Sequence, residues 1–305
     1  MQGNLVSDRP ASISLLRILV MLIFGYIIMG NVVAMMVIGF MVEGNLVEAL
    51  SNPTEHPEIS STLLIAQGLG SLTGLVLIPW YYLWSFEKRS ATALFGNLPN
   101  VVWIGVTALI VVGFGISMSP VTEWNANIEL PAWTGAFGEY MTTMEKQAES
   151  IIKAVTGNMT PGSFALAFVV ISLIAGLGEE LVFRGLIQTE LQRALGNPHV
   201  GIWLAAAFFS AFHLQIFGFF PRMLIGALVG YLYFWSGNLW YPVIAHMLNN
   251  GLQLIGLYLN QQGLLSYDVE SMESAPWPAV IASLIITGVL LYFYKINQTT
   301  RKQPS

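Results

Sequence analysis

Cysteine is absent from this 305-residue chain, and charged residues make up only 10% of it. The absence of cysteine excludes disulfides, thiolate metal sites and cysteine nucleophiles together. A net charge of -5 leaves no basic face for phosphate groups, so nucleic acid is not an expected partner. The sequence also contains no internal repeat, low-complexity tract or phosphate-binding glycine loop. What remains is an apolar chain in which the positions of the few charged residues are informative.

Apolar runs recur along almost the whole chain, which is 55% hydrophobic with a mean hydropathy of +0.65. Each run approaches the roughly 20 residues that a bilayer-spanning helix needs. We therefore predict an all-α integral membrane protein with one polytopic domain, 1–305, and a bundle of about eight transmembrane helices. The first apolar run is too long for a signal-peptide core, and we expect it to remain in the mature protein. The predicted spans are 13–42, 61–85, 101–119, 163–190, 200–217, 222–236, 240–260 and 277–295.

Basic residues predict the orientation of the chain, because they collect on the cytoplasmic side of membrane proteins. One side of the eight-span arrangement carries Arg9, Arg17, Lys88, Arg89, Arg193, Lys295, Arg301 and Lys302. The opposite loops are acidic and contain Glu43, Glu48, Glu55, Glu58, Asp268, Glu270 and Glu273. We therefore expect both termini in the cytoplasm. Lys146 and Lys153 lie on the other side, where glutamates outnumber them, and Arg222 is a further basic residue on that side.

The segment 120–160 is the one long stretch that we expect outside the membrane. Between residues 138 and 155, apolar side chains recur at intervals of three and four residues, which predicts an amphipathic helix. The apolar stripe consists of Met141, Met144, Ala148, Ile151 and Val155. The helix is either a lid or partner-binding element, or a packing and interfacial support. Apolar stripes of this kind are most often packing faces, which favours the second interpretation.

The stretch GLGEELVFRG, residues 176–185, places three charged side chains inside a predicted span. Glu180 and Arg184 are four residues apart and lie on one helical face, which predicts an ion pair. Glu179 points about 100° away and is left to present its carboxylate to another group, as a general base would. The alternative is a structural salt bridge with an incidental second glutamate, but ionisable groups within spans usually line a functional site.

Two further polar patterns lie in apolar segments. In FFSAFH, His213 follows Phe209 by four residues, and in AHMLNN, His246 and Asn250 lie one turn apart on one helical face. A single histidine in an apolar helix is more often a hydrogen-bonded packing residue. Together with Glu179, however, these groups could supply a base, a proton carrier or metal ligand, and donors for an oxyanion.

These motifs resemble those of the CAAX protease and bacteriocin-processing (CPBP, or ABI) family of intramembrane proteases. That family includes the type II CAAX prenyl endopeptidases and lysostaphin resistance protein A. The resemblance covers residues 160–255, which we take as the catalytic core region. The matching motifs, in order, are EExxxR (Glu179, Glu180, Arg184), FxxxH (Phe209, His213) and HxxxN (His246, Asn250).

The resemblance implies an intramembrane catalytic cavity and hydrolysis of a peptide bond in a membrane-associated protein or peptide. Glu179 and His213 would activate water, and His246 with Asn250 would hold the oxyanion. Glu180, Arg184 and Phe209 would orient these groups. A bacterial cytoplasmic membrane is the expected location, with the lipid bilayer and the substrate as partners.

A metal is the open question for this site. Glu179, His213 and His246 form a legitimate zinc set with water as fourth ligand. The HExxH spacing is absent, however, and we favour a mechanism without a cofactor.

Two other functions stay open. A non-proteolytic membrane scaffold or regulator of signalling or envelope proteins would retain the same motifs. A transporter or proton pathway would use the same intramembrane groups, but the polar sites occur only in the second half, whereas inverted repeats would place them in both halves. The patterns GSLTG at 70–74 and GALVG at 226–230 predict close helix contacts, either within the bundle or between chains.

Overall fold

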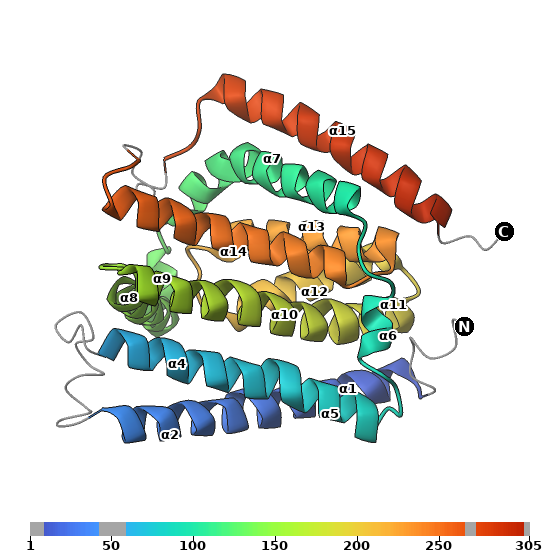
Figure 1. The fold of residues 1–305 in the computed structure, drawn as a ribbon, viewed down its shortest axis with the longest axis horizontal. Helices are drawn as coiled ribbons and strands as arrows, with labels where there is room; N and C mark the ends of the chain where they lie inside the picture. The colour runs from blue at the N-terminus through green and yellow to red at the C-terminus, as the bar shows by residue number, and fades with distance from the viewer. Residues whose placement is uncertain (1–8, 43–58, 266–272, 302–305) are drawn as a thin grey trace.

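The computed structural model describes residues 9–42, 59–265 and 273–301, and within these ranges all regular secondary structure is helical. The long helices lie side by side in a bundle (Figure 1). The first third of the chain forms α1 (Ala11–Leu22), η1 (Ile23–Gly30), α2 (Asn31–Met41), α4 (Ile59–Ser71), η2 (Leu72–Leu77), α5 (Ile78–Ser85), α6 (Thr92–Phe95) and α7 (Val101–Ala126). The middle forms η3 (Ala132–Thr134), α8 (Gly135–Thr156), α9 (Pro161–Ala167), η4 (Phe168–Ile174), α10 (Ala175–Glu180), η5 (Leu181–Gln188) and α11 (Thr189–Leu195). The last third forms α12 (Pro198–Phe212), α13 (Phe219–Ser236), α14 (Trp240–Gln261) and α15 (Trp277–Arg301).

Several of these elements join into helices long enough to cross a bilayer. In the described ranges, five helices are long and apolar enough, namely Ala11–Met41, Ile59–Ser85, Val101–Ala126, Pro161–Leu195 and Trp277–Thr299. Helices α12, α13 and α14 occupy the remaining predicted spans. The all-α membrane fold is thus confirmed, while the number of eight spans stays a prediction.

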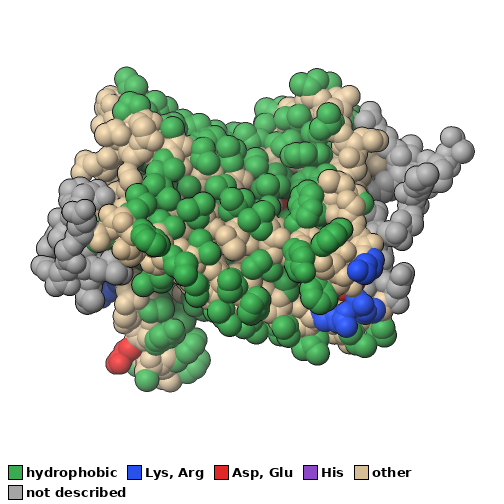
Figure 2. Space-filling model, turned by 60° about the horizontal axis from the view of Figure 1, so that its bottom comes forward, with side chains coloured by type: hydrophobic (Ala, Val, Ile, Leu, Met, Phe, Trp, Pro, Cys, Tyr) green, Lys and Arg blue, Asp and Glu red, His purple; other side chains and the backbone are tan. Residues whose placement is uncertain are grey.

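The surface of the bundle agrees with a lipid environment. Figure 2 shows one face covered largely by hydrophobic side chains, with basic side chains gathered at one edge. Among the large apolar side chains exposed on α1, η1 and α2, Phe40 is 91% accessible. A continuous exposed apolar surface of this extent is typical of a face that contacts another apolar phase.

One end of the bundle collects the basic residues that we grouped from the sequence. The beginning of α1 and the ends of α5, α11 and α15 lie at this end (Figure 1). A backbone hydrogen bond from Leu239 to Leu94 places the link between α13 and α14 there as well, so Arg222, near the start of α13, lies at the opposite end. That the basic end faces the cytoplasm stays a prediction. Glu43, Glu48, Glu55, Glu58, Asp268, Glu270, Lys302 and the side chain of Arg301 lie outside the described residues.

The predicted amphipathic helix is α8, which packs against α4, α9 and α14. Val155 is buried, and Met141, Met144 and Ala148 are partly buried. Ile151, the remaining apolar residue of the stripe, is 45% exposed. Packing of the stripe against three helices supports the interpretation of α8 as a packing element.

The helix Pro161–Leu195 lies inside the bundle, between the Ile59–Ser85 helix and α14 (Figure 1). Its residues Leu181, Val182, Phe183 and Leu186 are buried in the largest hydrophobic cluster. The predicted small-residue contacts also occur within the bundle. A Cβ atom on Gly70 would lie 2.7 Å from the carbonyl oxygen of Gly30, and one on Gly226 would lie 3.3 Å from Ala206.

Candidate active site

The ion pair predicted from the EExxxR spacing is present and buried. Nη1 of Arg184 donates to Oε1 of Glu180 at 2.7 Å, and both side chains are at most 2% exposed. Nη2 of Arg184 donates to the carbonyl oxygen of Gly226 at 2.9 Å. The guanidinium carbon also lies 4.7 Å from the centre of the Phe209 ring, in cation–π geometry. Arg184 therefore connects α10 to α12 and α13.

The same carboxylate oxygen contacts a third helix. Oε1 of Glu180 lies 2.6 Å from Nδ1 of His246 on α14, a contact that the sequence did not predict. When Nδ1 carries the hydrogen and donates to Glu180, Nε2 is the ring nitrogen left for chemistry. That nitrogen lies 3.7 Å from Oε2 of Glu179. The two neighbouring glutamates thus contact opposite sides of one imidazole.

Glycine at position 176 permits this close approach of α10 and α14. A Cβ atom there would lie 2.9 Å from Cγ of Met247 and 3.3 Å from the Met247 backbone nitrogen. A larger side chain would therefore separate His246 from Glu180. Directly after Glu180 the helix widens into the π-helical turn η5, a deviation that occurs frequently at functional sites.

His213 lies at the end of α12 rather than inside a span that continues to residue 217, so the predicted range 200–217 was wrong at its C-terminal end. The helix stops because Leu214 adopts a φ of 54°, a left-handed conformation that ends regular helix. Nδ1 of His213 lies 2.9 Å from the carbonyl oxygen of Phe209. If Nδ1 donates this hydrogen bond, Nε2 of His213 can accept a proton.

Asn125, which the sequence did not single out, fixes the loop that follows His213. Its side chain is fully buried, donates to the carbonyl oxygen of Ile216 at 3.0 Å and accepts from the amide of Phe220 at 2.9 Å. Ser210 adds a hydrogen bond of 2.6 Å to the carbonyl oxygen of Phe219. These bonds hold the position at which α12 ends, and with it His213.

Asn250 lies one turn beyond His246 on α14. Its Nδ2 donates to the carbonyl oxygen of Ile171 at 2.9 Å, and its Oδ1 accepts from Asn249 at 3.1 Å. An amide nitrogen has two hydrogens, so one donor of Asn250 remains for a ligand. Ser172 donates to the carbonyl oxygen of Met247 at 2.8 Å and fastens α14 to η4 between these two residues.

Glu179 is at the centre of the polar groups. Its side chain is 17% exposed, and its charge interacts with His213, Tyr26 and Arg222 as well as facing His246. Arg222 is a second residue that the sequence did not assign to the site. Its Nη2 donates to Gln215 at 2.9 Å, and its charge also interacts with Glu145 of α8. The charged groups around Glu179 therefore extend, through Arg222, from α10 to α13 and α8.

The possible zinc set is not assembled in this arrangement. In the described part of the chain, no three histidine, aspartate or glutamate side chains are grouped closely enough to hold a metal ion. Nδ1 of His246 contacts Glu180 and Nδ1 of His213 contacts a backbone carbonyl, so Nε2 is the ring nitrogen of each histidine that is left for a ligand. The donors as placed do not fit a bound zinc ion, and we derive no step through one.

Comparison with known proteins identifies the segment that carries these residues. Residues 161–252 match the family described as type II CAAX prenyl endopeptidase Rce1-like. We call residues 161–252 the Rce1-like segment. The resemblance predicted from the three motifs is thereby confirmed, and the Rce1-like segment coincides closely with the expected core, 160–255. It contains Glu179, Glu180, Arg184, Phe209, His213, His246 and Asn250.

A curated relative gives a narrower match. The "Uncharacterized protein YpbD" of Bacillus subtilis (strain 168) is 33% identical to the chain over 82 residues. The match covers 26% of this chain and 39% of that protein. No solved structure matches the chain significantly.

Proposed function

We propose that this protein is an intramembrane endopeptidase that hydrolyses a peptide bond of a membrane-associated protein or peptide. The Rce1-like segment supports CAAX-type endopeptidase chemistry in general. One observation carries the assignment to residues. Glu179 faces Nε2 of a histidine whose other nitrogen is held by the buried Glu180–Arg184 pair.

In the proposed first step, Glu179 accepts a proton from a water molecule while the water oxygen forms a bond to the scissile carbonyl carbon. Nε2 of His213 assists by accepting a hydrogen bond from the same water. The electron pair of the carbonyl π bond moves to the oxygen and creates a tetrahedral oxyanion. A positioned base of this kind contributes about 10²–10⁴-fold to the rate.

His246 and Asn250 then stabilise the oxyanion. In its doubly protonated form, His246 donates from Nδ1 to Glu180 and from Nε2 to the oxyanion. The second amide hydrogen of Asn250 is the other donor. When the C–N bond breaks, the proton held by Glu179 moves to the leaving amine, which balances the reaction. Each oxyanion donor is worth about 10²–10³-fold in rate.

A direct assay separates the endopeptidase from the scaffold. Purified full-length protein would be incubated in detergent with a library of membrane-embedded peptides, with and without prenyl groups, and products would be mapped by mass spectrometry. Wild type and the control Glu149→Gln, which removes a carboxylate 58% exposed on α8, should cleave the same bonds. Glu179→Gln and His246→Ala should leave those peptides intact.

Two results would contradict the proposal. One is cleavage by Glu179→Gln at the wild-type rate. The other is a folded wild type that cleaves no library peptide, combined with Glu179→Gln and His246→Ala variants that keep wild-type function in cells. The second result would favour the scaffold.

A further inference from the structure

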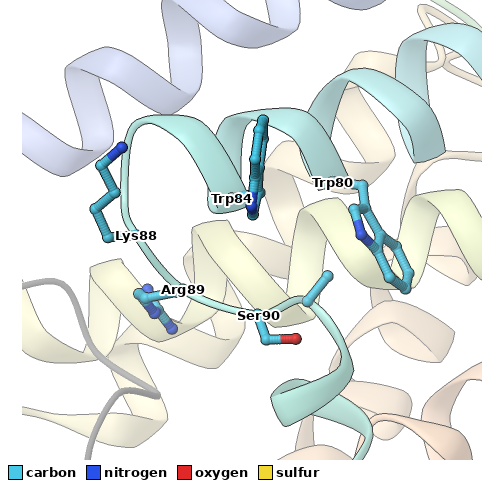
Figure 3. A pocket seen from close by; sticks show the side chains of 6 residues that line it. Trp80, Trp84, Lys88, Arg89 and Ser90 are labelled. Atoms are coloured by element: carbon cyan, nitrogen blue, oxygen red, sulfur yellow. The ribbon is translucent and has the colours of Figure 1, made fainter.

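A cavity at the basic end of the bundle lies away from the candidate active site. Its volume is about 290 Å³, and its lining includes Trp80 and Trp84 on α5 and Arg89 and Ser90 on the segment that follows (Figure 3). This volume is close to the lower limit of about 300 Å³ for small-molecule sites. The cavity is therefore large enough for a polar headgroup but not for a whole lipid.

The cavity is lined by side chains that are typical of a membrane surface. Trp80 and Trp84 are four residues apart on one face of α5, and they are 41% and 66% exposed. Tryptophan is enriched where a bilayer meets water, with its ring at the level of the lipid headgroups. These two side chains lie near the end of an apolar helix, so we expect the cavity to open at headgroup depth.

The cavity wall contains a buried cation. Arg89 is only 7% exposed, and burial lowers the pKa of its guanidinium, an effect that the charge of Glu190 partly opposes. The cavity wall therefore carries a positive charge in partly desolvated surroundings, where an opposite charge interacts more strongly than it does in water. An anionic group in the cavity would be attracted by this charge.

The neighbouring carboxylates already have other cationic partners. Glu87 accepts from Arg9 at 3.0 Å, and Glu190 accepts from Nε of Arg193 at 2.8 Å. At this end of the bundle, basic residues outnumber acidic ones among the residues that the structure describes. Figure 2 shows the resulting cluster of basic side chains at one edge of the apolar face.

The backbone brings a second cation to the cavity. After α5, the amide of Arg89 donates to the carbonyl oxygen of Leu83 at 2.9 Å, which turns the chain back sharply. This turn places Lys88 at a φ of 54°, a position at which glycine is the usual residue. The turn thus lets both Lys88 and Arg89 line the cavity.

We infer that this cavity binds the phosphate group of an anionic phospholipid. Arg89 and Lys88 would contact the phosphate, and Trp80 and Trp84 would pack against the glycerol and the first acyl carbons. Basic residues at the membrane surface attract anionic lipids with about 1 kcal/mol each, which corresponds to about fivefold in affinity. This inference does not depend on the proposed proteolysis.

Native mass spectrometry of the full-length protein in detergent tests the inference. The protein would be titrated with phosphatidylglycerol, and separately with phosphatidylcholine of the same acyl chains. We expect phosphatidylglycerol to bind more tightly, Lys88→Gln to weaken it about fivefold, and Trp84→Ala to weaken it as well. Arg89→Gln should act in the same direction, but because Arg89 is buried, the exposed Lys88 and Trp84 provide the variants that leave the fold intact.

Matched controls lie elsewhere on the molecule. Lys146→Gln removes an exposed lysine of α8, and Trp203→Ala removes a tryptophan of α12 that is 41% exposed, like Trp80. Neither should change the affinity. Equal affinities for the two lipids, or equal effects of the control and cavity variants, would overturn the inference. Displacement of phosphatidylglycerol by an equal concentration of inorganic phosphate would overturn the lipid assignment and indicate a soluble phosphate compound instead.

Discussion

Nδ1 of His246 lies 2.6 Å from Oε1 of Glu180, a residue 66 positions earlier in the chain. The same oxygen accepts from Arg184 at 2.7 Å, so the buried ion pair also holds an imidazole of another helix. Glu180 therefore has an orienting position, while Glu179 faces the opposite nitrogen of the ring. Changes at these two glutamates should consequently have different effects on stability and on activity.

Glu180→Ala should lower the free energy of unfolding by about 3–5 kcal/mol, because it leaves the Arg184 charge buried without its partner. The loss would be measured by equilibrium unfolding in mixed micelles. Glu149→Ala breaks the exposed pair with Lys153 and should cost no more than about 1 kcal/mol.

A double variant separates charge burial from catalysis. Glu180→Leu combined with Arg184→Met replaces the ion pair by apolar side chains and should recover most of the lost stability. It should stay inactive, because nothing then holds His246. Full activity of this stable double variant would show that Glu180 does not orient the site.

Gly176→Val should reduce the cleavage rate by about 100-fold, since displacing a positioned group by about 1 Å can have an effect of this size. The added side chain would meet Met247 and move α14, with His246, away from Glu180. Gly115→Val on α7 is the control, because a Cβ atom there has no neighbour within 4 Å. Equal rates for the two variants would contradict the role given to this helix contact.

Asn125→Leu should leave the carbonyl of Ile216 and the amide of Phe220 without their partner, at a cost of about 1–3 kcal/mol for each buried group. Because the loop holds His213, kcat should fall while KM for the peptide stays near its wild-type value. Asn127→Leu, at an exposed position of the same helix end, should leave both constants unchanged. A variant that loses stability but keeps kcat would limit Asn125 to a purely structural role.

Removal of divalent metal ions should leave the cleavage rate unchanged, since the candidate ligands of the described site are not grouped around a common point. The assay compares wild-type protein before and after dialysis against a zinc chelator. Activity lost on chelation and restored by zinc would instead make Glu179, His213 and His246 metal ligands.

Local patterns predicted much of this structure. Apolar runs located the long helices, because a span needs a minimum length of apolar sequence. The four-residue spacing of Glu180 and Arg184 predicted their contact, because helical geometry alone brings such residues together. The three motifs likewise indicated the Rce1-like segment, because residue types and spacings in the sequence are enough to identify them.

Other features depend on packing that no local pattern contains. The hydrogen bond between His246 and Glu180 joins two helices and requires the small side chain at Gly176. The end of α12 depends on the backbone of Leu214 and on Asn125, a residue of α7. Hydropathy continued this helix to residue 217, because the residues beyond His213 are also mostly apolar.

The most direct test of the account is the initial cleavage rate of one library peptide by Glu179→Gln relative to wild type. Gln keeps the size of the side chain but cannot accept the proton of water, so the rate should fall by at least about 100-fold. Thermal unfolding of the two proteins would be compared in parallel, and we expect similar midpoints because Glu179 is partly exposed and outside the Glu180–Arg184 ion pair. A folded Glu179→Gln variant that cleaves the peptide at the wild-type rate would contradict the central claim that this carboxylate activates water.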